Sequence, residues 1–256
     1  MTERIFDSET AGPIVLGLSL PVGSVRVQVI ENLITARVVL RTDDNTGPAA
    51  DAINRARSQQ NGQAFGIEVP EMPNGVVVQD RRGGTVIQSV GGMSIVGGTV
   101  RINGRVVSGG MANMPTVSPI EVTVCLPAQS SIAVVSQSAD TEVYGYVDRM
   151  EFRSVSGSLG ADGVRELRAN TTSGDIRVGR ATEQITAHSV SGDIKVRLYD
   201  GRSATLNTTS GDIEVQATSG AAGHVSAHSV SGDVEVAGAR HLNVTADSVS
   251  GRVRNR

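Results

Sequence analysis

The stretch SVSGDIKV, at Ser189–Val196, recurs along the chain with small changes. TTSGDIRV precedes it at Thr171–Val178, while TTSGDIEV and SVSGDVEV follow at Thr208–Val215 and Ser229–Val236. A repeated octapeptide is either a binding site used several times or a backbone bend used several times. The residues around it distinguish the two, because only a bend requires a regular pattern on both sides.

Six copies align on their glycine, with spacings of 17, 18, 19, 21 and 19 residues. A degenerate copy, SQSADTEV at Ser136–Val143, has Ala139 in place of the glycine. Self-similarity at a nearly fixed period indicates a stacked repeat architecture. The six glycines are Gly157, Gly174, Gly192, Gly211, Gly232 and Gly251.

Apolar and polar positions alternate on both sides of each glycine. In one copy, Ile185 and Ala187 are apolar while Thr186 and His188 between them are polar. Such alternation is typical of a β-strand with one buried face. Each repeat is therefore predicted to be a strand, a bend, a second short strand and a loop of variable length. The predicted core residues two positions after the glycine are Leu159, Ile176, Ile194, Ile213, Val234 and Val253.

The Ser-Gly-Asp residues are predicted to make the bend. Glycine adopts a positive φ without steric cost, and an aspartate side chain can hydrogen-bond local backbone N–H groups. The predicted turn residues are thus the six glycines together with Asp175, Asp193, Asp212 and Asp233. The motif alternates between TTSG and SVSG, which leaves open whether one coil contains one bend or two.

A single repeat cannot bury its apolar face, so the repeats must stack on one another. The predicted fold is all-β: a single-domain β-solenoid over residues 74–256, regular from about 120 to 256 and irregular before that. Residues 1–73 are predicted to form a small strand-rich α+β cap. Its one helix is expected at about 48–60, in PAADAINRARSQQ, with Pro48 in the first turn.

Composition limits the partners. A net charge of −3 offers no basic field for nucleic acid, and no apolar run is long enough to span a membrane. We therefore expect no nucleic-acid partner, no direct membrane insertion and a cytoplasmic protein. The single cysteine, Cys125, excludes an intramolecular disulfide and is expected to be a buried, unreactive thiol.

No residues are predicted to be catalytic, cofactor-binding or metal-binding. Stacked aspartates could attract calcium, but capping of the turn is the favoured explanation, because calcium-binding solenoids carry more glycine and aspartate in each coil. The four histidines lack a third convergent ligand; His188 and His228 share an outward position. The enzymatic alternative is a carbohydrate-binding or carbohydrate-active parallel β-helix protein. With three Tyr, three Phe and no Trp, the chain has few aromatic platforms for sugars.

The run VTVCLPAQSSIAVVSQSADTEV, followed by SVSGSL, TTSGDIRV and SVSGDIKV, resembles the bacterial "putative adhesin" family of unknown function, also called the toastrack domain. The resemblance covers residues 120–253. It implies a non-enzymatic β-solenoid that serves as an interaction or multimerisation module, often in stress or envelope-related systems. It transfers no catalytic residues to this chain.

The sequence thus predicts a non-enzymatic scaffold that presents its surface to a protein partner or to another copy of itself. The array continues into SVSGRVRNR, and the end of a solenoid exposes unpaired strand groups. Arg252, Arg254 and Arg256 are therefore the candidate interaction end, where end-to-end stacking or a homo-oligomer contact is expected.

Overall fold

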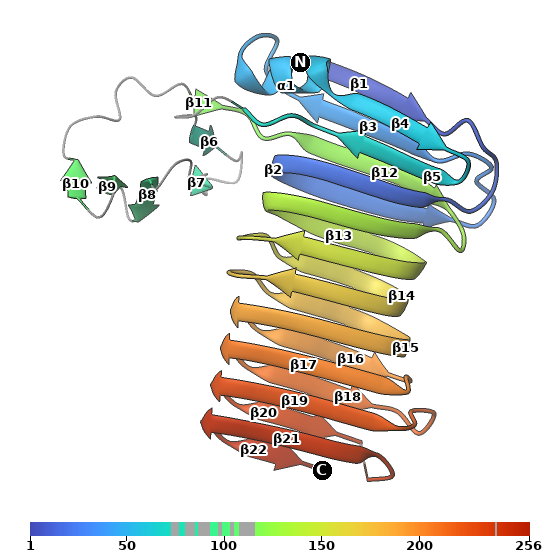
Figure 1. The fold of residues 1–256 in the computed structure, drawn as a ribbon, viewed down its shortest axis with the longest axis vertical. Coiled ribbons are helices and arrows are strands. Elements are labelled where there is room, and N and C mark those ends of the chain that lie inside the picture. The colour runs from blue at the N-terminus through green and yellow to red at the C-terminus, as the bar shows by residue number, and fades with distance from the viewer. Residues whose placement is uncertain are drawn as a thin grey trace.

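The computed structural model describes residues 1–72, 117–238 and 240–256, together with short strands between residues 77 and 117. The fold is all-β, as predicted, and its coils stack along the long axis of the molecule with the two termini at opposite ends (Figure 1). The main sheet has 16 strands. These are β1 (Thr2–Asp7), β2 (Val15–Ile30), β3 (Arg37–Thr42), β4 (Arg57–Asn61), β5 (Ala64–Glu68), β12 (Glu121–Pro127), β13 (Ser131–Ser154), β14 (Leu159–Thr171), β15 (Ile176–Ser191), β16 (Ile194–Tyr199), β17 (Ser203–Ser210), β18 (Ile213–Ala217), β19 (His224–Ser231), β20 (Val234–Ala237), β21 (Asn243–Ser250) and β22 (Val253–Asn255).

Two small sheets complete the strand list. One contains β6 (Val77–Gln79), β7 (Thr85–Val86) and β11 (Thr116–Val117), and the other contains β8 (Met93–Val96), β9 (Thr99–Ile102) and β10 (Arg105–Val107). The irregular early coils predicted before residue 120 otherwise lie outside the described residues.

Each coil contains one Ser-Gly-Asp bend. Ser189 pairs with Thr208, and Thr208 pairs with Ser229, so consecutive motifs lie directly on one another. The strands after the bend form one layer, β16-β18-β20-β22, and those before it form the other, β17-β19-β21. The long strands β13, β14 and β15 pass through both layers. The motifs TTSG and SVSG therefore alternate from one coil to the next, and no coil contains both.

The core lies between the two layers. Five of the six predicted core residues are at most 1% exposed, namely Leu159, Ile176, Ile194, Ile213 and Val234. The prediction for Val253 is wrong, since this residue is 43% exposed. It lies in β22, which pairs only with β20 among the described strands, so nothing covers its other side.

The helix is shorter than predicted. Helix α1 spans Pro48–Arg55, with Pro48 in its first turn, and buries Ala49, Ala50, Ala52 and Ile53. The next residues, Arg57–Asn61, form β4 and pair with β5. They are polar, so a longer helix would have had no apolar face to bury, whereas a strand satisfies their backbone groups. Within the described part of the chain, no helix is long and apolar enough to cross a membrane.

The main sheet does not stop at the boundary of the predicted cap. Strand β2 pairs in parallel with β13, and Gly23 lies opposite Ala139. The sequence PVGSV around Gly23 is thus a further bend. It was not predicted, because it lacks the Ser-Gly-Asp residues of the motif. At the far end, α1 packs against β1 and β3.

Candidate functional site

The bend glycines are required by close packing of the coils. A Cβ built on any of the six would lie 2.6–2.7 Å from the carbonyl carbon of the residue at the same place in the preceding coil. For Gly192 that residue is Gly174, and for Gly157 it is Ala139. The expected positive φ is wrong: only Gly232 has one, at 158°, which is nearly extended.

The bend aspartates also differ from the prediction. They accept hydrogen bonds from the neighbouring coil, whereas the sequence predicts bonds within their own turn. The Oδ1 atom of Asp175 accepts a hydrogen bond from the backbone N–H of Asp193, one coil further, at 3.0 Å. Asp193 accepts from Asp212 and Asp212 from Asp233, at 2.8 and 2.7 Å. The series ends at Asp233, which accepts from Arg252 at 2.8 Å. We call this series the aspartate ladder.

A second ladder runs beside it. The hydroxyls three residues before five of the six glycines donate to the glycine carbonyl of the preceding coil at 2.7–3.2 Å. The donors are Thr171, Ser189, Thr208, Ser229 and Ser248. These side-chain hydrogen bonds give the glycine carbonyl groups at the bend a partner, which buried carbonyl groups need. The recurrent polar residues of the motif are therefore hydrogen-bonded to the neighbouring coil.

The metal hypotheses receive no geometric support. Among the described residues, no group of three or more His, Cys, Asp or Glu side chains is placed to hold a metal ion. His188 and His228 are not neighbours, because Asn207 lies between them in the column. Nδ1 of His188 is 3.1 Å from Nδ2 of Asn207, and Nδ1 of His228 is 3.6 Å from Oδ2 of Asp247. Cys125 is half-buried.

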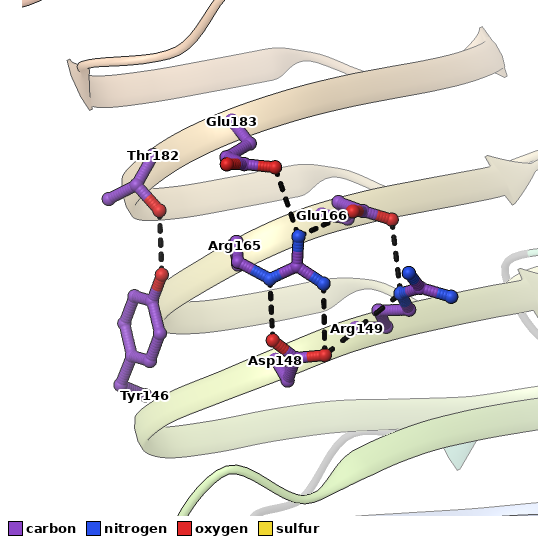
Figure 2. A network of polar contacts seen from close by, with 7 residues as sticks. All are labelled: Tyr146, Asp148, Arg149, Arg165, Glu166, Thr182 and Glu183. Atoms are coloured by element: carbon purple, nitrogen blue, oxygen red, sulfur yellow. Dashed lines mark hydrogen bonds and ion pairs between the residues drawn. The ribbon is translucent and has the colours of Figure 1, made fainter.

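An arginine network braces the opposite edge of the coils (Figure 2). Arg165 makes two hydrogen bonds to Asp148 in the preceding coil, at 2.5 and 3.0 Å. Its Nη1 donates to Glu166 at 2.7 Å and to Glu183 of the next coil at 3.0 Å. Arg149 adds an ion pair to Glu166 at 3.2 Å. One guanidinium thus links three successive coils.

The network lies where the register of the strands shifts. Between β14 and β15 the shift falls between Val164 and Glu166, so that Arg165 is the residue without a direct partner. Tyr146 follows a similar shift between β13 and β14, and its hydroxyl is 2.6 Å from that of Thr182 (Figure 2). Bulges of this kind re-aim side chains at the edge of a sheet. This cluster could not be predicted from the repeat, because the register of the strands shifts at Arg165 and no column of the motif includes this residue.

The chemistry of the network is that of paired charges. The hydrogen bond from Arg165 lowers the pKa of Asp148, and the same bond raises the pKa of Arg165. A carboxylate held ionised in this way is a poor proton donor at neutral pH. A groove of about 610 Å³ beside the network is lined by Arg149, Glu151 and Arg168 among others.

The predicted interaction end is exposed and carries weak ion pairs. Arg252 lies 3.7 Å from Asp233, and Arg254 and Arg256 lie 3.9 and 4.0 Å from Glu235. The inward residues of the last coil, Val244 and Ala246, are only partly buried, unlike the matching residues of earlier coils. The edge of β21 and β22 therefore presents both backbone groups and apolar surface.

The chain is similar in fold to solved bacterial proteins. A "putative adhesin" from Bacteroides fragilis has 12% identity and a TM-score of 0.57, and the match covers 100% of this chain and 97% of that one. A "putative lipid binding protein" from Parabacteroides distasonis has 13% identity, a TM-score of 0.46 and coverages of 99% and 97%. The likeness to the first of these proteins shows the fold alone. No curated protein matches the chain in sequence.

The family model for the Toastrack DUF4097 domain matches residues 95–255. This range contains the bends, both ladders and the arginine network, and it amounts to more than half of the chain. The chain therefore belongs to the Toastrack DUF4097 family.

Proposed function

We propose that this protein is a non-enzymatic interaction scaffold that binds a protein partner or a second copy of itself. The observation that carries the proposal is the pair of ladders, which hold the outward side chains of successive coils in one register. A surface fixed in this way loses little conformational entropy on binding, so that more of the contact energy becomes affinity. The scaffold role also agrees with the family and with its adhesin-like structural neighbour.

The arginine network supports a role without catalysis. Acid–base chemistry on a sugar needs one carboxylic acid that is protonated and one carboxylate that is free to act. Asp148, Glu166 and Glu183 instead share the guanidinium of Arg165. The carbohydrate-active alternative is therefore the weaker candidate. A stress or envelope-related setting is part of the proposal and rests on the family resemblance alone.

The contact we propose is the edge of the last coil, formed by β21 and β22. The carbonyl of Arg252 and the N–H of Arg256 point toward β20. Because successive residues of a strand point their backbone groups to opposite sides, the N–H groups of Val253 and Asn255 point to the open side. An unpaired strand edge of this kind is a template for β-sheet pairing with another chain.

Size-exclusion chromatography with light scattering tests self-association over a wide range of protein concentration. We expect a species larger than the monomer that disappears in Asn255→Pro, which removes one open-side N–H and leaves the bonds to β20 intact. The matched control is Gly17→Ala in β2, where a Cβ meets nothing within 4 Å. A wild-type protein that stays monomeric at high concentration, and whose partner from the native host binds Asn255→Pro equally well, would refute the proposed contact.

A further inference from the structure

The two layers of the solenoid carry different chemistry on their outer surfaces. We define the polar face as the outward side chains of β17, β19, β21 and the second half of β15. From the loop edge to the bend edge its columns are Gln184, Ser203, His224 and Asn243; Thr186, Thr205, Ser226 and Thr245; His188, Asn207, His228 and Asp247. It contains no lysine, arginine or glutamate, and its one carboxylate is Asp247.

The hydrogen-bonding groups of the polar face are largely unused. In the described part of the chain, the hydroxyls of Thr186, Thr205, Ser226 and Thr245 have no hydrogen-bond partner. Among the described residues, the side chains of the third column form hydrogen bonds or ion pairs only with one another, through His188 with Asn207 and His228 with Asp247. The face therefore offers a regular array of neutral donors and acceptors to a ligand.

The opposite layer pairs several of its own charges. Arg177 pairs with Asp175 at 2.5 Å, and Lys195 and Arg254 pair with Glu214 and Glu235 of adjacent strands. Charged side chains that already have partners gain little from a ligand, because a new contact must first break the old one. The contrast between the layers points to the polar face as the ligand-binding one.

A shallow groove follows the polar face along its bend edge. One part, of about 430 Å³, lies among Asn207, Thr209, His228, Val230, Asp247 and Val249. A second part, also about 430 Å³, shares His188 and Ser189 with the first and continues past Val190 to Asn170 and Arg153. Val190 and Val230 are 48% and 49% exposed, so the groove has an apolar rim beside its polar columns.

A ligand for this groove must be neutral, rich in hydroxyl groups and partly apolar. Coils of a β-solenoid repeat about every 4.8 Å, which is close to the length of one sugar residue in an extended chain. An extended peptide is less suitable, because it binds through the free backbone groups of a sheet edge and those of this face are paired. An acidic polymer would find neither guanidinium nor ammonium groups in the columns of the polar face, and Arg153 at the far end of the groove is already paired with Glu151.

We propose that the polar face binds a neutral polysaccharide strand that runs along the stacking direction of the coils. Sugar hydroxyls bond to the threonine, serine and asparagine columns, and C–H faces of the rings pack on Val190 and Val230. The polar face shares β21 with the last-coil edge proposed above, but it uses outward side chains whereas the edge uses backbone groups, so either proposal can fail without the other.

Native gel electrophoresis through soluble polysaccharides provides the test. The probes are galactomannan, xyloglucan, mixed-linkage β-glucan and dextran, with alginate as the acidic counterpart. We expect at least one neutral polymer to retard the protein and alginate to have no effect. Ser226→Glu should weaken that binding by about tenfold or more, because it places a carboxylate against a ligand without cations.

Gln216→Glu is the matched control, since it adds the same charge to an exposed position of β18 in the opposite layer. It should leave the retardation unchanged, and thermal unfolding should show that both variants remain folded. Retardation by none of the four neutral polymers, retardation by alginate only, or an equal loss in Gln216→Glu would each overturn the proposal. Retention of a protein partner by the polar face with no polysaccharide binding would do so as well.

Discussion

The substitution Gly192→Ala tests why the motif contains glycine. The added Cβ would lie 2.6 Å from the carbonyl carbon of Gly174, against 3.4 Å for ordinary contact. To restore that contact the two coils must separate at the bend. The separation strains two bonds between the coils: Ser191 N–H to the carbonyl of Thr172, at 2.8 Å, and Asp193 N–H to Asp175, at 3.0 Å.

The magnitude follows from these two effects. Each hydrogen bond contributes about 1 kcal/mol net, and forcing extra atoms into a packed site costs about 1–3 kcal/mol. We therefore expect Gly192→Ala to lower the free energy of unfolding by about 2–4 kcal/mol. Urea unfolding followed by circular dichroism measures it, with Gly17→Ala as the control, because that glycine lies in a strand with open space around its Cα.

Gly192→Asn distinguishes steric crowding from a requirement for positive φ. Asparagine tolerates the left-handed region far better than alanine, so it would rescue a glycine needed for its dihedral angles. With crowding as the cause, Asn is at least as damaging as Ala. The reasoning is refuted if Gly192→Ala unfolds within about 0.5 kcal/mol of the wild type, or if Asn is clearly better tolerated than Ala.

Three further substitutions probe the ladder, the core and the network. Asp193→Ala should cost about 1 kcal/mol in urea unfolding while Asp193→Asn, which keeps an acceptor oxygen, costs less; equal costs would speak against the ladder. Tyr199 is fully buried, its hydroxyl has no partner among the described residues, and burial raises its pKa to about 12, so Tyr199→Phe should raise stability by about 1 kcal/mol, and a loss would contradict this. The pKa of Asp148 is lowered from 3.8, so its stabilising pair with Arg165 is fully present above that pH and is lost as the pH falls below it. Between pH 5 and 2.5 the midpoint temperature of thermal unfolding should therefore fall more steeply in the wild type than in Asp148→Asn. Parallel curves of midpoint temperature against pH would count against the pair.

The periodic residues were sufficient to predict the solenoid. Alternation around each glycine placed Ile194 in the core and His188 on the surface, because a strand has only two faces. The sequence of a single repeat does not show which atoms of the neighbouring coil contact it. Gly192 is explained by Gly174 of the neighbouring coil and not by its own dihedral angles, and the aspartates act in the same way.

The remaining features depend on irregularity. Arg165 stands at a register shift within the strands, where no repeated column predicts its neighbours. Val253 has the same motif position as Ile194, but its exposure depends on whether another strand covers it. Helix α1 ends at Arg55 because the polar residues Arg57–Asn61 would give a longer helix no apolar face to bury, and they pair with β5 as a strand.

The repeated motif joins one coil to the next through its aspartate. Amide hydrogen exchange of Asp193→Ala, measured residue by residue, is the decisive measurement. We expect the amide of Asp212, which donates to Asp193, to lose protection, while the amide of Asp193 itself keeps its bond to Asp175 and its slow exchange. Loss of protection confined to the amides of the bend at 192–194, with Asp212 unchanged, would show instead that the aspartate stabilises its own turn.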